Sequence, residues 1–384
     1  MKRIGIVAGE KSGDYLGSEL IKSIKLRYPD AEFVGLAGPL MQEQGAVSLA
    51  EMDKISIMGI AGALKSLFVI LGIHQKIYKH MLAWQPDVFI GIDVPDFNLS
   101  LEIKLKQAGI PIVHYVSPTV WAWRGERIHK IKRAVNLMLT LFPFEETFYQ
   151  KNKIPVKYVG HPLAKPVLDW QVSAQSKETM KLVSNKRLIA VLPGSRGSEV
   201  SRLAPIMLKA CAELSNKYND LKFIIPAANE RLFIYLKREL NSDSTPVNVI
   251  LGHSRDVLAS AHLAILASGT AALEAALFAK PMVVMYKVAK LEEYYAARTM
   301  VVKHFSMPNH LTDPPIVKEL IQEQATVENL VAEVSELLDD QSKYASMHTT
   351  LAAIAPALSE NSGEIACDAI EQLLASRQNA SNPN

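Results

Sequence analysis

Short apolar runs rich in Val, Ile and Leu recur along the first part of the chain. Polar stretches long enough to form helices separate most of them. Strands buried on both faces of a parallel sheet have this composition, and the connections between them are usually helices. The pattern therefore predicts an α/β unit. Its expected strands are at 3–9, 32–38, 87–93, 111–116, 137–142 and 156–160.

The alternation restarts after the polar stretch QVSAQSKETMKLVSNK at 171–186. Towards the C-terminus, VENLVAEVSELLDD and EIACDAIEQLLAS have apolar positions three and four apart, which predicts helices. We therefore expect two Rossmann-like domains, 1–165 and 166–345, followed by helices over 346–384. Those helices would pack back on the first domain or on a partner subunit. The expected strands of the second domain are at 187–194, 221–227, 247–252, 262–268 and 281–286.

Composition narrows the class of protein. The chain has 384 residues, 49% of them hydrophobic, which is enough for two substantial cores. Its 42 Lys and Arg against 39 Asp and Glu leave a net charge of +3, which argues against a dedicated nucleic-acid binder. The only cysteines, Cys211 and Cys367, lie far apart, so neither a disulfide framework nor a thiolate zinc site is expected. This composition favours the cytosol.

The relation to membranes rests on one segment. The longest apolar stretch, LFVILGI at 67–73, is well below the ~20 residues that cross a bilayer. The segment GALKSLFVILGIHQKIYKHMLAW at 62–84 nevertheless has more apolar surface than one core-facing stripe requires, with lysines along it. It fits a helix lying on a membrane surface and, equally, a helix buried in the protein. The N-terminal apolar stretch is broken by Glu10 and Lys11, which indicates a strand rather than a signal peptide.

In open α/β sheets, ligands bind beyond the carboxyl ends of the strands, so the residues after each apolar run are the candidates for chemistry. After the first run stands AGEKSGD at 8–14. Its spacing does not fit GxGxxG, which argues against a dinucleotide site and a NAD oxidoreductase. Ser12 or Asp14 serves equally well as a simple helix cap.

The run VFIGIDVPDFN at 88–98 ends on two carboxylates, Asp93 and Asp96. Asp96 precedes a predicted helix that ends at Gly109, and an aspartate there is most often the N-cap. A carboxylate at the mouth of a cleft can also accept a proton from a bound hydroxyl group. Asp93 is expected to brace the turn.

The segment HYVSPTVWAWRGERIHKIKR at 114–133 combines tryptophans with clustered positive charge. Trp121, Trp123 and Arg124 would suit an anionic, partly apolar ligand. The alternative is a helix with a solvated basic face and aromatic side chains in the core.

Two turns in the second half have the composition of phosphate sites. In LPGSRGSE at 192–199, backbone N–H groups and the Arg196 guanidinium could hold a diphosphate, although the GK[ST] ending of a P-loop is missing. At the other turn, Ser268, Gly269 and Thr270 precede Glu274, a carboxylate that could bind the hydroxyls of a ribose.

Together these motifs resemble the lipid-A-disaccharide synthase family of glycosyltransferases. The resemblance runs through nearly the whole chain, because a long series of short motifs occurs in the family's order. They are AGEKSGD, GLAGPLM, MGI, PDFN, HYVSPTVWAWR, PFE, VGHP, LPGSRGSE, ASGTAALE, PMVVMY, MPN and KELIQ.

The resemblance implies a GT-B architecture, with two Rossmann-like domains whose parallel sheets face a central cleft. It implies transfer of 2,3-diacylglucosamine from its UDP-linked donor to the 6-hydroxyl of 2,3-diacylglucosamine 1-phosphate, with release of UDP and inversion at the anomeric carbon. No metal or other cofactor is implied, and no DxD-like metal motif occurs. The enzyme would lie peripherally on the cytoplasmic face of a Gram-negative inner membrane, through 62–84 and basic residues near 124–133. Whether it forms a homodimer stays open.

The family's site residues can be carried over to matching positions. Asp96 is similar to the candidate general base, and Glu10 is a reserve candidate for the same role. Arg196 would neutralise the charge that builds on the departing diphosphate. The expected donor-binding residues are Gly194, Ser195, Arg196, Glu199, Ser268, Gly269, Thr270, Glu274, Asn309 and Gln322. The expected acceptor-binding residues are Ser12, Asn98, Ser117, Trp121, Trp123 and Arg124.

The chain departs from the family pattern at three positions: Lys11 replaces a common alanine, Gly62 a common acid and Lys165 a common aspartate. An extra cation near Glu10 would shift the pKa of that acid, and a missing acid in the cleft would slow or alter turnover. Two alternatives therefore stay open. One is a GT-B-like UDP-sugar epimerase, and the other is a nucleotide-sugar or lipid-binding paralogue without turnover.

Overall fold

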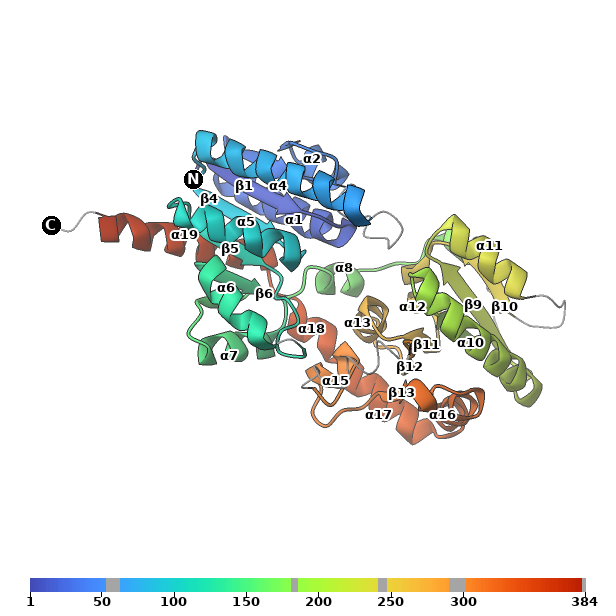
Figure 1. Cartoon of the computed structure of the whole chain (residues 1–384). Coiled ribbons are helices and arrows are strands. Elements are labelled where there is room, and N and C mark those ends of the chain that lie inside the picture. Colours follow the sequence, from blue (N-terminus) through green and yellow to red (C-terminus); the bar gives the residue numbers. More distant parts are fainter. Residues whose placement is uncertain (53–62, 124, 181–185, 241–246, 290–301, 382–384) are drawn as a thin grey trace. The chain divides into compact units, whose positions relative to one another are not determined.

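The computed structural model describes residues 1–52, 63–123, 125–180, 186–240, 247–289 and 302–381 (Figure 1). The chain divides into two compact units. Unit 1 comprises Met1–Pro162 and Leu358–Asn384, and unit 2 comprises Leu163–Ala357. Unit 2 is thus inserted, in sequence, into unit 1. Where the two parts of unit 1 meet, the His161 N–H donates to the Leu358 carbonyl at 2.9 Å.

Unit 1 is built on a seven-stranded parallel sheet with the order β3-β2-β1-β4-β5-β6-β7. All six predicted strands are confirmed. The strand β3 was missed because it has only three residues, of which Val47 is exposed. The strands are Arg3–Ala8 (β1), Glu32–Leu36 (β2), Ala46–Ser48 (β3), Val88–Ile92 (β4), Ile112–Tyr115 (β5), Leu137–Thr140 (β6) and Val156–Tyr158 (β7).

Helices pack on this sheet through apolar stripes. Ile77 and Met81 of α4 and Leu101 of α5 share one buried cluster with Phe89 of β4. The C-terminal helix α19, red in Figure 1, packs on α1, where Arg27 pairs with acids of α19. The helices are Lys11–Arg27 (α1), Pro39–Glu43 (α2), Ala63–Trp84 (α4), Pro95–Gln107 (α5), Gly125–Arg127 (η2), Ile128–Ala134 (α6), Pro143–Lys151 (α7) and Ser362–Ser381 (α19).

Unit 2 has a six-stranded parallel sheet with the order β10-β9-β8-β11-β12-β13. Its five predicted strands are confirmed, whereas β13 was missed because KELI is short and half polar. The strands are Arg187–Leu192 (β8), Leu221–Ala227 (β9), Val247–Leu251 (β10), Leu263–Ala267 (β11), Met282–Tyr286 (β12) and Lys318–Ile321 (β13).

The helices of unit 2 include the long amphipathic α10, whose neighbour α16 was predicted from its apolar spacing. They are Ala164–Leu168 (α8), Ala174–Thr179 (α9), Gly197–Lys217 (α10), Glu230–Glu239 (α11), Ser254–Ser260 (α12), Thr270–Leu277 (α13), Met307–Leu311 (α15), Gln322–Gln324 (η3), Val327–Asp339 (α16), Gln341–Ala352 (α17) and Ile354–Leu358 (α18).

Each sheet has one position where the direction of the chain's progress across it reverses. In unit 1 this switch point lies between β1 and β4, and in unit 2 between β8 and β11. Ala8 is in register with Ile92, and Leu192 with Leu266, so the turns that follow these strands are neighbours. Open α/β sheets bind their ligands beside such switch points, at the carboxyl ends of the strands.

Candidate functional site

The turn after β4 has an unusual backbone. Asp93 and Val94 both have positive φ, +52° and +43°, a conformation that costs non-glycine residues energy. Val94 is the N-cap of α5, with Pro95 next, so the expectation that Asp96 is the N-cap is wrong. The Asn98 side-chain amide donates to the carbonyls of Ile92 at 3.2 Å and Asp93 at 2.8 Å, which holds the turn in place.

Because Asp96 has no capping duty, its carboxylate projects into solvent. Its side chain is 71% exposed, and Oδ1 accepts a hydrogen bond from Nη2 of Arg127 at 2.9 Å. Beside it lies a pocket of about 260 Å³, whose lining includes Asp93, Pro95, Trp123 and Arg127. An exposed carboxylate held by one cation beside a pocket can accept a proton from a bound hydroxyl group.

A buried ion pair lies behind this turn. Glu102 of α5 and His114 of β5 are both 0% exposed, with 2.6 Å between Oε1 and Nδ1. Burial lowers the pKa of His114. The charge and hydrogen bond of Glu102 and the charge of Asp93 raise it by more, so the net effect is an increase in pKa. A Cβ at Gly91 would lie 2.1 Å from Oε1 of Glu102, so the strand needs glycine there.

The loop after β5 supplies the other wall of the pocket. Ser117 is buried and its hydroxyl bonds with the Tyr149 hydroxyl at 2.8 Å, whereas Trp123 is 40% exposed. The guanidinium of Arg127 lies over the Trp123 ring at 5.9 Å. Trp121 is half-buried, and its indole N–H donates to Glu145 at 3.1 Å. Arg124 lies outside the described residues.

The turn after β1 contains two further predicted residues, and both are exposed. Glu10 is the N-cap of α1 without a side-chain capping bond, and Ser12 lies in its first turn. The idea that Ser12 or Asp14 caps this helix is therefore wrong. Asp14 is buried and accepts the N–H groups of Leu40 and Met41, both at 3.0 Å, so it caps α2 instead. Lys11 is exposed beside Glu10.

In unit 2, the turn between β8 and α10 presents an open helix N-terminus. Gly194 has φ +124°, and a Cβ there would lie 2.7 Å from Oε2 of Glu199, so only glycine fits. Arg196 is the N-cap of the 21-residue α10. Its side chain is 79% exposed and contacts Glu199 at 3.3 Å, while Ser195 is exposed beside it. The Arg196 backbone N–H donates to Oε2 of Glu199 at 3.4 Å. The helix dipole and the guanidinium together suit an anionic group.

The neighbouring turn between β11 and α13 has a similar form. Gly269, with φ +150°, is the N-cap of α13, and Thr270 is exposed at the first helical position. The Ser268 hydroxyl is already used, because it donates to the Phe305 carbonyl at 2.8 Å. Glu274 is 16% exposed and pairs with Arg255 of α12 at 3.2 Å.

Asn309 and Gln322 both act on the backbone. The buried Asn309 amide receives the N–H groups of Ile316 and Val317 and donates to Val317 and Glu319. Gln322, at the end of β13, accepts the Val288 N–H at 2.8 Å. Sequence reasoning missed Glu319, which accepts the N–H groups of Phe305 and Ser306 and so fixes the segment that holds Ser268. Nothing in the KELI pattern identified its partners.

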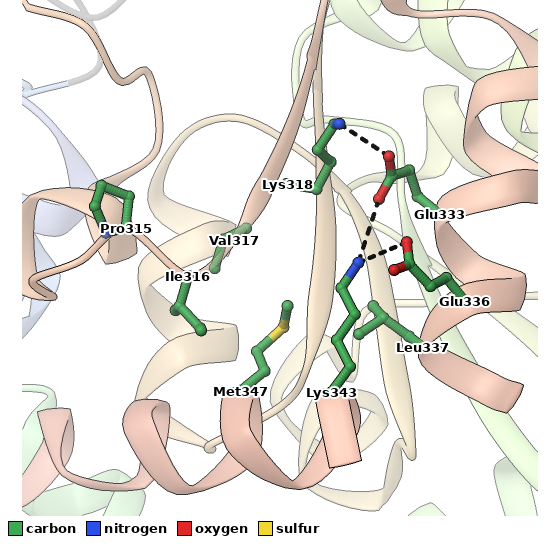
Figure 2. Close-up of a pocket in the computed structure, with 9 residues that line it drawn as sticks. All are labelled: Pro315, Ile316, Val317, Lys318, Glu333, Glu336, Leu337, Lys343 and Met347. Carbon is green, nitrogen blue, oxygen red and sulfur yellow. Dashed lines mark ion pairs between the residues drawn. The ribbon is translucent and has the colours of Figure 1, made fainter. Parts of the chain in front are cut away.

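A second pocket, of about 290 Å³, belongs to unit 2 and lies at the amino end of β13 rather than at the carboxyl edge. Figure 2 shows Lys318 and Lys343 directed at Glu333, and Lys343 also at Glu336. Since these lysines are paired with these acids and lie at the opposite end of β13, this pocket is separate from the two turns. No group of three His, Cys, Asp or Glu within the described ranges is arranged to hold a metal ion.

The segment 62–84 is buried in the core along one part and exposed along another. Residue 62 lies outside the described residues, and α4 begins at Ala63. Ile73, Ile77 and Met81 are buried in the core, whereas Phe68 is 72% exposed. Val69 and Leu71 are exposed as well. None of the described helices has the length and apolar content needed to span a bilayer.

Several solved structures share the fold of this chain. A Staphylococcus aureus MnaA structure with UDP matches with a TM-score of 0.66 at 14% identity, covering 98% of this chain and 97% of that one. The calicheamicin glycosyltransferase CalG4 matches with a TM-score of 0.60 at 14% identity, covering 98% and 99%. The fold is therefore GT-B, with switch-point turns in each Rossmann-like unit.

Sequence comparison narrows the class to a family. A family model described as lipid-A-disaccharide synthetase matches residues 4–375. The lipid-A-disaccharide synthase of Aeromonas hydrophila is 44% identical over 97% of this chain and 98% of its own. That of Psychromonas ingrahamii is 46% identical over 88% and 89%. The chain belongs to the lipid-A-disaccharide synthase family, and it is a glycosyltransferase of lipid A biosynthesis.

Proposed function

We propose that this glycosyltransferase transfers 2,3-diacylglucosamine from UDP-2,3-diacylglucosamine to the 6-hydroxyl of 2,3-diacylglucosamine 1-phosphate. The observation that carries the proposal is the 44% identity with a curated lipid-A-disaccharide synthase over nearly the full length of both chains. The site residues support it, because an exposed carboxylate and two open helix N-termini follow the strands beside the switch points.

In the acceptor half of the reaction, Asp96 takes the proton of the 6-hydroxyl. The acceptor oxygen then forms a bond to the anomeric carbon, while the bond from that carbon to the β-phosphate oxygen breaks. Attack from the side opposite the leaving group inverts the anomeric centre. Arg127 supports this role, because its contact at 2.9 Å fixes the direction of the Asp96 carboxylate.

In the donor half, the electron pair of the broken bond leaves with UDP. The first N–H groups of α10 and the Arg196 guanidinium would stabilise the charge on the diphosphate. The Gly269 and Thr270 turn would add further N–H donors, and Glu274 would accept the ribose hydroxyls. Glu274 already pairs with Arg255, so it adds no unpaired negative charge. Glu199 contacts Arg196, so the diphosphate would share that guanidinium with it.

The test is direct. The purified protein is incubated with both lipid-linked sugars, and UDP and a tetraacylated disaccharide 1-phosphate are measured by chromatography and mass spectrometry. Both products should appear together, and omission of the acceptor should abolish them. Conversion of the donor sugar without any acceptor would instead indicate an epimerase. UDP binding without either change would indicate a paralogue that has lost turnover.

We further propose that the exposed residues Phe68, Val69 and Leu71 of α4 lie on the cytoplasmic face of the inner membrane, where the acylated substrates would reside. Phe68, Val69 and Leu71 are exposed, and the exposed Lys76 follows five residues after Leu71 on the same helix, an arrangement that suits an anionic lipid surface.

Replacing these three apolar residues by serine should weaken binding to anionic vesicles by at least about 10-fold, because each loses buried apolar area. The melting temperature should stay constant, since the side chains are already exposed. A matched control replaces Leu26, Ile234 and Leu251, which are also exposed. Equal vesicle binding by both variants, or unfolding of the first, would rule the membrane surface out.

A further inference from the structure

Glu145 is a buried carboxyl group that the proposed chemistry does not use. It follows β6 in the first turn of α7 and is 2% exposed. Oε2 accepts the Phe142 backbone N–H at 3.2 Å, and Oε1 accepts the Trp121 indole N–H at 3.1 Å. A carboxyl group is costly to bury without hydrogen bonds, and here one of the two bonds comes from the loop after β5.

The Trp121 side of this contact continues towards Trp123 and Arg127, which line the 260 Å³ pocket beside Asp96. The backbone N–H of Trp123 donates to the Thr119 carbonyl at 3.1 Å, so Trp121 and Trp123 belong to one tight turn. The Trp121 ring also packs edge-on against Phe144, with 4.8 Å between ring centres. On the other side of the turn, Arg127 lies over Trp123 and donates to Asp96.

We propose that Glu145 is a positioning residue of the acceptor site. By fixing Trp121, Glu145 holds the turn over 118–123 and so the position of the Trp123 ring. Arg127 lies over that ring and donates a hydrogen bond to Asp96. This inference rests on the proposed role of Asp96 as the base, and it assigns to the PFE motif a function that the motif's sequence alone did not suggest.

The electrostatics of the cluster agree with this geometry. Burial raises the pKa of Glu145 to about 7, although hydrogen bonds from Trp121, Phe142 and Ser117 oppose the increase. His161 lies near Phe142 and stays neutral, because burial lowers its pKa to about 4. Tyr149 also stays neutral, since burial raises its pKa. Among these described groups, Glu145 is therefore the one that changes charge near pH 7.

The sign of the effect on folding separates positioning from simple stabilisation. The folded-state pKa of Glu145 is above the ordinary value of 4.5, so protonation favours the folded state. Its contribution to stability is present at low pH and is lost as the pH rises through about 7. The ionised form nevertheless accepts both N–H donors, which makes it the form that holds the turn.

The experiment compares wild type with Glu145→Gln between pH 6 and 8. The amide can accept only one of the two N–H donors, so kcat/KM for the acceptor should fall about 10- to 100-fold at pH 8. The KM for the UDP-linked donor should stay unchanged. Wild-type activity should decline below about pH 7 as Glu145 is protonated, and the variant should lack this step. Glu146→Gln, the adjacent acid of α7, is the matched control.

Two readouts do not require turnover. The melting temperature of wild type should fall relative to Glu145→Gln as the pH is raised from 6 to 8. The indole N–H resonance of Trp121, assigned by its loss in Trp121→Phe, should titrate with a midpoint near 7 in wild type and not in Glu145→Gln. If wild type turns over neither lipid-linked sugar while this resonance titrates, the proposed function fails and the fixing of Trp121 by Glu145 stands.

The proposal is overturned if Glu145→Gln retains acceptor kcat/KM within twofold and the pH profile of wild type. Should Glu145→Gln not fold, Trp121→Phe removes the same hydrogen bond from the other partner and keeps the ring. Trp121→Phe should then show the same loss of acceptor kcat/KM, and unchanged values would overturn the proposal equally.

Discussion

The carboxyl edges of the two sheets are constructed differently. Beside the switch point of unit 1, the non-glycine residues Asp93 and Val94 adopt positive φ, and the buried acids Glu102 and Glu145 lie behind the site. Beside the switch point of unit 2, glycines adopt positive φ, and the helix N-termini after them are exposed.

The difference matches the chemistry proposed for each edge. One reactive carboxylate must keep a fixed direction, which side-chain contacts from several elements can impose. A diphosphate spreads its charge over many oxygens and needs close backbone approach, which glycine turns permit. Substitutions on the two edges should therefore fail in different ways.

The largest effect is expected for Asp96→Asn. The amide keeps the shape of the side chain but cannot accept the proton, so turnover should fall by about 10²–10⁴-fold. UDP affinity, measured by calorimetry, should be nearly intact. Asp96 belongs to unit 1, whereas the two turns proposed to bind the diphosphate belong to unit 2. The exposed Glu126→Gln is the control. Turnover close to that of wild type would remove Asp96 from the role of base.

A smaller effect with the opposite signature is expected for Arg196→Ala. Loss of a charge-assisted contact should weaken UDP binding by about 10- to 100-fold and lower the rate with it. Lys209→Ala removes an exposed cation further along α10 and should change neither. Unchanged UDP affinity in Arg196→Ala would place the diphosphate away from this turn.

The smallest effect is expected for Val94→Gly. Relief of the left-handed backbone, about 1–2 kcal/mol, is offset by greater freedom of the unfolded chain and lost packing. The free energy of unfolding should change by about 1 kcal/mol or less. Gly194→Ala on the other edge should instead lose about 1–3 kcal/mol, because φ is +124° and Glu199 blocks the Cβ. Urea denaturation of both variants tests the contrast, and equal losses would contradict it.

Much of the fold could be predicted from apolar periodicity. Long buried strands have a continuous apolar signal, and the helix that contains Asp96 ends at Gln107, two residues before Gly109. The strands that escaped, β3 and β13, are short and carry exposed or charged residues. Edge strands are half solvated, so they lack the continuous apolar signal of central ones.

The candidate site could be predicted only as far as local turns reveal it. Gly194, Arg196 and Asp96 stand in recognisable strand-to-helix turns. The acids that hold those turns in place, such as Glu145, could not be recognised from the sequence, because their hydrogen-bond partners are distant in sequence. Trp121 precedes Glu145 by 24 residues, and no periodicity links them. A buried acid in one sequence looks like a surface acid until its partner is known.

The order of the elements along the chain has a consequence for biosynthesis. The helix α19 packs on α1, and Arg27 bonds to Asp368 of α19, yet all of unit 2 lies between them in the sequence. During translation, the surface of α1 that packs on α19 therefore stays uncovered until the ribosome has synthesised all of unit 2 and then α19. A nascent chain halted before Leu358 leaves the first Rossmann unit uncovered there, so the earliest part of the protein is among the last to finish folding.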